Sequence, residues 1–126
     1  SQKDIINMQK KKTGELFGFC CESVAIIKGL DTKKRKKLKE IGINIGLLFQ
    51  LVDDLIDYKG DSKIVGKPTK SDEKKGKATL LNLLGYEGTV NFANNLKKRI
   101  DLQIKVYGRK ANDLLDSVEF ILERKF

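Results

Sequence analysis

The fold of this chain is decided by the stretch IGINIGLLFQLVDDLID, residues 41–57. Eight of the twelve residues from Ile41 to Val52 are apolar, and at helical spacing they leave no clearly polar face. A helix of this kind is buried on nearly all sides. The stretch therefore predicts a helix at the centre of a packed core.

The sequence before this stretch has the same helical periodicity. Residues 5–28 are expected to form one amphipathic helix, which Gly29 would stop. Asp31 and Thr32 can then cap the helix that carries the central stretch. We expect that helix to end at residues 58–60.

The rest of the chain continues the pattern. A lysine-rich loop is predicted at 59–77, because this segment is polar and contains the single Pro68. A short apolar run follows at 80–84 and is ended by Gly85, and amphipathic helices are predicted at 89–107 and 111–126. No strand alternation of useful length is visible, so the predicted fold class is all-α.

Length and composition limit the function classes. The chain has 126 residues, and 26 Lys and Arg against 17 Asp and Glu give a net charge of +9. One domain with a real core is expected, and no stretch of about 18 apolar residues predicts stable membrane insertion. The absence of histidine excludes a His-based triad or a His-ligated zinc site.

The positive charge has two explanations. It favours an anionic partner, but 22 of the 26 basic residues are lysines, which also fits a compositional bias across the chain. A basic nucleic-acid-binding module is a weaker alternative, because arginine is scarce and the aromatic residues, 7% of the chain, are scattered. We therefore expect no nucleic-acid partner. The neighbouring Cys20 and Cys21 cannot form an ordinary structural disulfide, which favours a reducing, cytoplasmic location.

The sharpest local pattern is an acidic cluster at the end of the apolar helix. Asp53 and Asp57 are one helical turn apart, and Asp54 lies on their flank, so three carboxylates are expected to converge. Like charges near a helix C-terminus are unfavourable, and folding does not require them. A bound Mg²⁺ would relieve this conflict, because carboxylate oxygens suit that ion. The alternative is an exposed acidic turn.

Two lysines in the predicted loop favour the metal. Lys67 follows Gly66 and Lys77 follows Gly76, and the loop begins close enough to fold back over the acids. Lysines beside a metal-bridged diphosphate would stabilise a pyrophosphate leaving group. The spacing is not that of a P-loop.

Five motifs in this order resemble the trans-prenyl diphosphate synthases, closest to the bacterial farnesyl diphosphate synthase (geranyltranstransferase) branch. They are Lys12-Thr13-x-x-Leu16, Phe49-Gln50-x-x-Asp53-Asp54-x-x-Asp57, Gly60-Asp61, Gly66-Lys67 and Gly76-Lys77-x-Thr79-Leu80. The resemblance implies an isoprenoid-synthase helical bundle. It also implies a Mg²⁺-dependent transferase that condenses an allylic diphosphate (dimethylallyl or geranyl) with isopentenyl diphosphate.

The resemblance also implies roles for particular residues. Asp53, Asp54 and Asp57 match the family's second aspartate-rich motif, which helps to hold Mg²⁺ on the allylic diphosphate. Lysines that bind this diphosphate are matched by Lys12, Lys67 and Lys77. Catalytic roles fall to Lys12, Thr13 and Gln50, of which the last two match polar residues near the reacting carbons. A homodimer is expected from the family.

The chain departs from the family pattern most clearly at the first aspartate-rich motif. It contains a single Asp-Asp pair, so the first aspartate-rich motif of the family is absent. We therefore expect residues 1–126 to be the C-terminal portion of a synthase domain, inactive without the N-terminal part of the same protein. Two alternatives are a longer-chain (geranylgeranyl or polyprenyl) diphosphate synthase and a non-catalytic prenyltransferase-like subunit.

Overall fold

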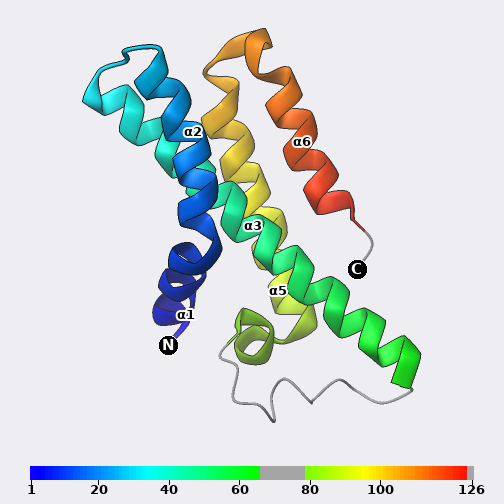
Figure 1. Ribbon diagram of the computed structural model, residues 1–126. Coiled ribbons are helices and arrows are strands. Elements are labelled where there is room, and N and C mark those ends of the chain that lie inside the picture. The colour runs from blue at the N-terminus through cyan, green and yellow to red at the C-terminus, as the bar shows by residue number, and fades with distance from the viewer. Residues whose placement is uncertain (66–78, 125–126) are drawn as a thin grey trace.

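The computed structural model describes residues 1–65 and 79–124, and within these ranges every regular element is a helix (Figure 1). The all-α prediction is therefore confirmed. The elements in chain order are α1 (Gln2–Gln9), the π-helical turn η1 (Lys10–Gly14), α2 (Glu15–Ile27), α3 (Thr32–Val65), α5 (Leu80–Lys105), the 3₁₀ turn η2 (Gly108–Ala111) and α6 (Asn112–Glu123).

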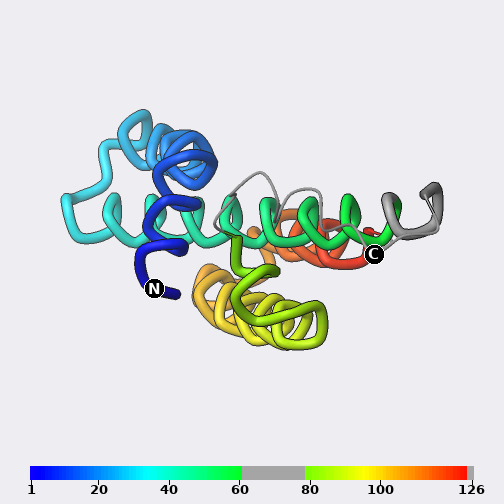
Figure 2. Tube along the Cα trace, turned by 90° about the horizontal axis from the view of Figure 1, so that it is seen from below, coloured from blue at the N-terminus to red at the C-terminus, as the bar shows by residue number. Residues whose placement is uncertain are grey.

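The apolar stretch forms the centre of the fold, as predicted. It lies in α3, which has α2 on one side and α5 on the other, while α6 packs against both α3 and α5 (Figure 2). Leu48, Leu51 and Leu55 of α3 are fully buried, together with Ile100 of α5 and Val118 of α6. Within the described ranges, none of the helices combines the length and apolar character that crossing a membrane requires.

Glycines allow α2 and α3 to lie unusually close together. Gly14 at the end of η1 faces Gly46 of α3, and Gly18 of α2 faces Gly42, so each side of this contact presents two glycines four residues apart. A Cβ atom on Gly42 would lie 2.4 Å from the carbonyl oxygen of Phe17. This close approach brings the end of η1 directly against the middle of α3.

The first predicted helix, residues 5–28, is not one regular α-helix. The five residues of η1 form a π-helical turn between α1 and α2. Such turns are rare and are often found at functional sites. Gly14 at the end of this turn is buried against Ile43, so the interruption coincides with the closest contact to α3.

The predicted end of the central helix at residues 58–60 is wrong, because α3 continues to Val65. One glycine costs only about 1 kcal/mol in a helix, and Gly60 has open space around it. The ring of Tyr58 also contacts that of Tyr86, with centroids 5.8 Å apart, which anchors this end of α3 to α5. Residues 59–65 of the predicted lysine-rich loop are thus helical.

The apolar run and the helix predicted from residue 89 belong to one element, α5. Thr79 caps its first turn by accepting a 3.1 Å hydrogen bond from the Asn82 amide. Gly85 interrupts the helix with a φ of 73°, which agrees with its predicted role as a stop. The hydroxyl of Thr89 donates a 2.7 Å bond to the Gly85 carbonyl oxygen and holds the two parts together.

Candidate active site

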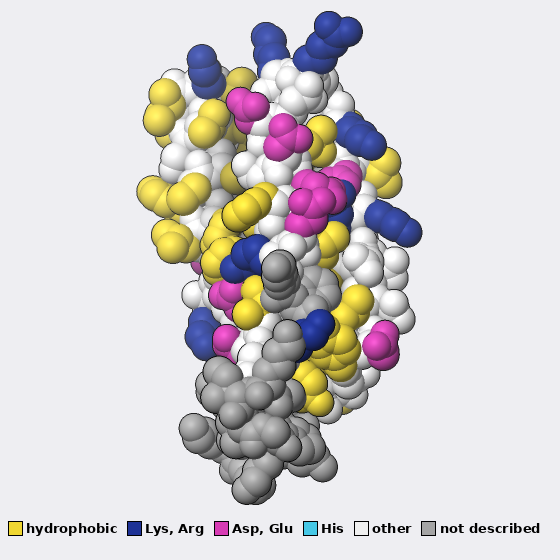
Figure 3. Space-filling view, turned by 90° about the vertical axis from the view of Figure 1, so that its right-hand side faces the viewer, with side chains coloured by type: hydrophobic (Ala, Val, Ile, Leu, Met, Phe, Trp, Pro, Cys, Tyr) yellow, Lys and Arg dark blue, Asp and Glu magenta, His cyan; other side chains and the backbone are white. Residues whose placement is uncertain are grey.

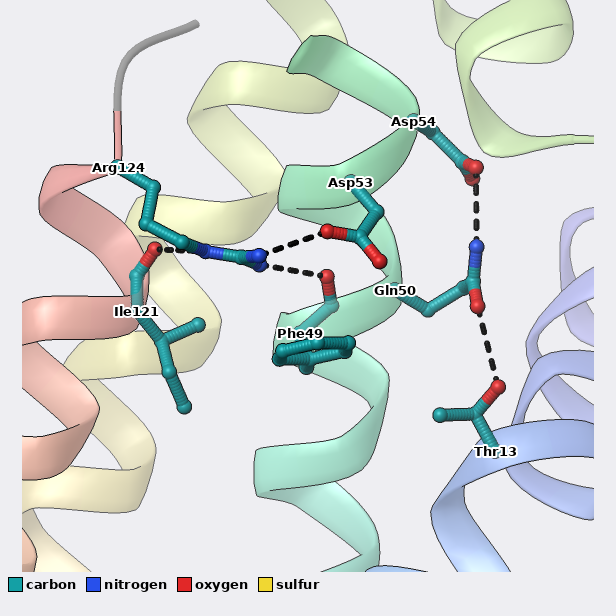
Figure 4. Close-up of polar contacts among 7 residues, drawn as sticks. All are labelled: Thr13, Phe49, Gln50, Asp53, Asp54, Ile121 and Arg124. Carbon is teal, nitrogen blue, oxygen red and sulfur yellow. Dashed lines mark hydrogen bonds and ion pairs between the residues drawn. The ribbon is translucent and has the colours of Figure 1, made fainter. Parts of the chain in front are cut away.

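A chain of hydrogen bonds joins three of the predicted site residues (Figure 4). Oγ1 of Thr13 donates to Oε1 of Gln50 at 3.1 Å, and Nε2 of Gln50 donates to Oδ1 of Asp54 at 3.0 Å. Thr13 lies in η1 and the other two residues lie one turn apart on α3. The structure therefore brings the Lys-Thr motif and the acidic motif, which the sequence analysis singled out separately, into direct contact.

The other oxygen of Asp54, Oδ2, is buried and has no hydrogen-bond partner among the described residues. Burial raises the pKa of the Asp54 carboxyl, the bond from Gln50 opposes this rise, and the charges of Asp57 and Asp53 add to it. A buried carboxylate oxygen without a partner is unfavourable unless a cation or donor binds it.

Asp53 points away from Asp54, toward α6, where Arg124 binds it (Figure 4). Nη1 of Arg124 lies 2.7 Å from Oδ1 of Asp53, and Nη2 donates to the Phe49 carbonyl oxygen at 3.2 Å. The guanidinium carbon also lies 4.3 Å from the centroid of the Phe49 ring. Arg124 is a site residue that the sequence analysis missed, since no local pattern marks an arginine 71 positions from its partner.

The remaining predicted residues lie around this centre. Asp57 has an exposed side chain one turn beyond Asp53. Lys12 is also exposed, and it borders a surface depression with Asp4, Asn7, Met8 and Lys11. Its positive charge makes the smallest contribution to the pKa of Asp54, where it partly opposes the upward shift. Lys67 and Lys77 lie outside the described residues.

The three carboxylates do not converge as expected. Among the residues that the structure describes, no group of three acidic or cysteine side chains is arranged to hold a metal ion. Asp53 and Asp54 are instead bonded to different neighbours, Arg124 at the end of α6 and Gln50 of α3 respectively. The donor chemistry nevertheless fits Mg²⁺, which needs only one or two protein carboxylates when water and phosphate oxygens complete its shell. Oδ2 of Asp54, which has no hydrogen-bond partner among the described residues, is an oxygen of this kind.

A family model described as "Polyprenyl synthetase" matches residues 1–116. Among curated relatives, a farnesyl diphosphate synthase of Micrococcus luteus is 32% identical over 90% of this chain and 39% of its own length. A geranylgeranyl diphosphate synthase of Sulfolobus acidocaldarius is 30% identical over 95% of this chain and 36% of its own length.

A solved structure gives the same result for the fold. An FPP/GFPP synthase from Zymomonas mobilis superposes with a TM-score of 0.76 at 38% identity, covering 93% of this chain and 37% of that one. The chain thus spans less than two fifths of the length of each of these three relatives. Because the family model covers nearly all of its residues, the chain belongs to the polyprenyl synthetase family.

Proposed function

We propose that this chain supplies part of the active site of a short-chain trans-prenyl diphosphate synthase. The whole protein would join an allylic diphosphate to isopentenyl diphosphate and release pyrophosphate. The observation that carries the proposal is the bonded series Thr13–Gln50–Asp54, which connects two motifs of the family in one place. The names of the relatives, which range from farnesyl to decaprenyl diphosphate synthase, support the reaction class and leave the product length open.

The residues of this chain would act mainly through charge. Loss of pyrophosphate from the allylic substrate creates a polyanion, and fixed positive groups that face it lower the barrier. In the proposed site this role falls to Lys12, with Lys67 and Lys77 as further predicted contacts. Bound Mg²⁺ would neutralise the diphosphate, and Asp53, Asp54 and Asp57 are the residues proposed to hold it.

The other product of ionisation is an allylic cation, which must be kept from water. The oxygens of Thr13 and Gln50 are proposed to lie near the reacting carbons, where they would stabilise this cation and assist removal of a proton. The fixed bond between the two side chains supports this role, because it removes the freedom of both groups before substrate binds. Mg²⁺ dependence, homodimer formation and a cytoplasmic location remain predictions within the same proposal.

The test is the Asp53→Ala variant of the whole protein, assayed by incorporation of labelled isopentenyl diphosphate into an allylic acceptor. We expect activity to fall by about two to three orders of magnitude, the typical effect of removing an essential electrostatic group. Asp116→Ala is the matched control, because Asp116 is exposed on α6. Normal transfer by Asp53→Ala, or no transfer by the unmodified protein with any allylic acceptor, would overturn the proposal.

A further inference from the structure

Arg124 is held in place by hydrogen bonds from all three of its guanidinium nitrogens and by one aromatic ring. Nε donates to the Ile121 carbonyl oxygen at 3.3 Å, and the two terminal nitrogens bind Asp53 and the Phe49 carbonyl oxygen (Figure 4). The plane lies against the Phe49 ring, and the side chain is only 23% exposed. These contacts fix a permanently charged group directly beside Asp53.

Arg124 binds only one of the two carboxylate oxygens of Asp53. Oδ1 accepts the bond from Nη1, and among the described residues no donor to Oδ2 is present. The carboxylate is turned toward α6, whereas the Asp54 carboxylate is turned toward η1. A cation bound by Asp53 would therefore lie within a few ångströms of the guanidinium.

We propose that Arg124 is a positioning residue that weakens the binding of Mg²⁺ alone at Asp53 and makes metal binding depend on a diphosphate. This inference rests on the proposed function. Arg124 has two opposing effects: it orients a ligand, and it repels the metal. Orienting the short side chain of Asp53 has only a small effect on the Mg²⁺ affinity. The positive charge of Arg124, by contrast, repels a divalent ion in a half-buried site, where water screens the charges less. The repulsion therefore dominates.

A diphosphate would reverse this balance. The negative charge of the diphosphate would attract both Mg²⁺ and the positively charged side chains around the site. The repulsion between Arg124 and Mg²⁺ is therefore offset once metal and diphosphate are both bound. Metal and diphosphate then raise each other's affinity by the same factor, as linkage requires. Arg124 thus limits metal binding in the absence of diphosphate.

The experiment measures Mg²⁺ binding to the whole protein by calorimetry, without substrate and again with saturating inorganic pyrophosphate. We expect Arg124→Gln to bind Mg²⁺ alone about tenfold more tightly, a change of about 1.4 kcal/mol. The tightening of Mg²⁺ binding by pyrophosphate should shrink by a similar factor. Arg124→Lys, which keeps the charge, should stay within about twofold of the unmodified protein.

Arg35→Gln is the matched control. It removes the same charge from an ion pair with Glu22, 3.1 Å long, away from the acidic motif. Its Mg²⁺ affinity should not change. Unchanged or weaker Mg²⁺ binding by Arg124→Gln overturns the inference, and so does a tenfold change of the Mg²⁺ affinity in Arg124→Lys. The inference is also overturned if neither the unmodified protein nor Arg124→Gln binds Mg²⁺. If Arg124→Gln does not fold, Arg124→Met replaces it, because this variant also removes the charge but keeps an apolar side chain against the Phe49 ring.

The two proposals fail separately. Tighter Mg²⁺ binding by Arg124→Gln in a protein without prenyl transfer overturns the proposed function alone. Prenyl transfer with an Mg²⁺ affinity that is insensitive to Arg124 overturns this inference alone.

Discussion

Oγ1 of Thr13 donates a 3.1 Å hydrogen bond to Oε1 of Gln50 across 37 positions of sequence. The bond determines the orientation of the Gln50 amide, since its oxygen faces Thr13 and its nitrogen must then face Asp54. One hydroxyl in the π-helical turn thereby controls a carboxylate on α3 that it does not touch. The contribution of this bond to the free energy of unfolding can be measured without substrate.

Thr13→Val should lower the free energy of unfolding by about 1 kcal/mol, the usual net effect of one hydrogen bond. Valine has nearly the same shape but leaves Oε1 of Gln50 without its donor. Thr13→Ser keeps the donor and should cost less. Urea denaturation of the three proteins checks this. Equal stability of the Val and Ser variants would mean that the hydroxyl contributes nothing.

Gly42→Ala should be strongly destabilising, by about 1–3 kcal/mol or more. The added Cβ would meet backbone atoms, the Phe17 carbonyl oxygen at 2.4 Å and the Gly18 Cα at 2.8 Å, which cannot move independently. Gly60→Ala on the same helix is the control, since nothing lies within 4 Å of its added Cβ. It should stabilise the protein by about 0.5–1 kcal/mol through helix propensity. Thermal unfolding of both variants provides the measurement.

The ion pair between Lys97 on α5 and Glu119 on α6 should make stability depend on pH. The hydrogen bond from Lys97 lowers the pKa of Glu119, while bonds to Asp101 and Glu119 raise that of Lys97. A carboxyl with a lowered folded pKa stabilises the protein above its unfolded pKa, about 4.3, and loses this effect as pH falls through the folded value.

Glu119→Gln should therefore lower the Tm at pH 7 but not at an acidic pH below the folded pKa of Glu119, where both proteins carry a neutral side chain. Asp116→Asn is the control for general charge effects, because Asp116 is exposed and has no ion-pair partner in the part of the chain that the structure describes. A Tm difference for Glu119→Gln that is the same at both pH values would exclude the ion pair as its source.

Lys12→Gln in the whole protein should raise the KM for the allylic diphosphate and lower kcat, each by about tenfold or more, because a fixed positive charge is lost beside the leaving group. Lys33→Gln removes the same charge from the exposed run at the start of α3 and should leave both values unchanged. Steady-state kinetics at saturating isopentenyl diphosphate distinguishes the two. Equal effects would mean that the net charge, not the position of Lys12, governs substrate binding.

The distribution of charge on the surface explains why we expect different effects from Lys12→Gln and Lys33→Gln. Residues 33–37, the densest basic run, are all exposed, and Arg35 is occupied by Glu22. Lysine, arginine and acidic side chains are distributed over the face seen in Figure 3, interspersed with apolar side chains. Charge alone is thus a poor guide to the substrate site, whereas the position of Lys12 directly before Thr13, which contacts Gln50, is informative.

Helix content and the central helix could be predicted because they depend on local periodicity. The break at Gly85 was also predictable, since its backbone has a positive φ that glycine adopts readily. The end of α3 could not be placed correctly. Its extension to Val65 depends partly on the contact between Tyr58 and Tyr86, which lie on different helices.

The candidate site also has a part that could be predicted from the sequence and a part that could not. Thr13, Gln50 and Asp54 were all singled out from motifs, but their hydrogen-bonded order was not predictable. Arg124 was missed altogether, because it comes to Asp53 only after α6 has packed against α3.

The sequence by itself determined that this chain is helical, that residues 41–52 lie at its centre and that an acidic motif follows them. Each of these properties follows from residues within a few turns of one another. Only the tertiary structure decided that Asp53 faces Arg124 and Asp54 faces Gln50. Periodicity specifies which face of a helix is buried, but the partner of a polar side chain depends on which distant element packing brings within hydrogen-bonding distance.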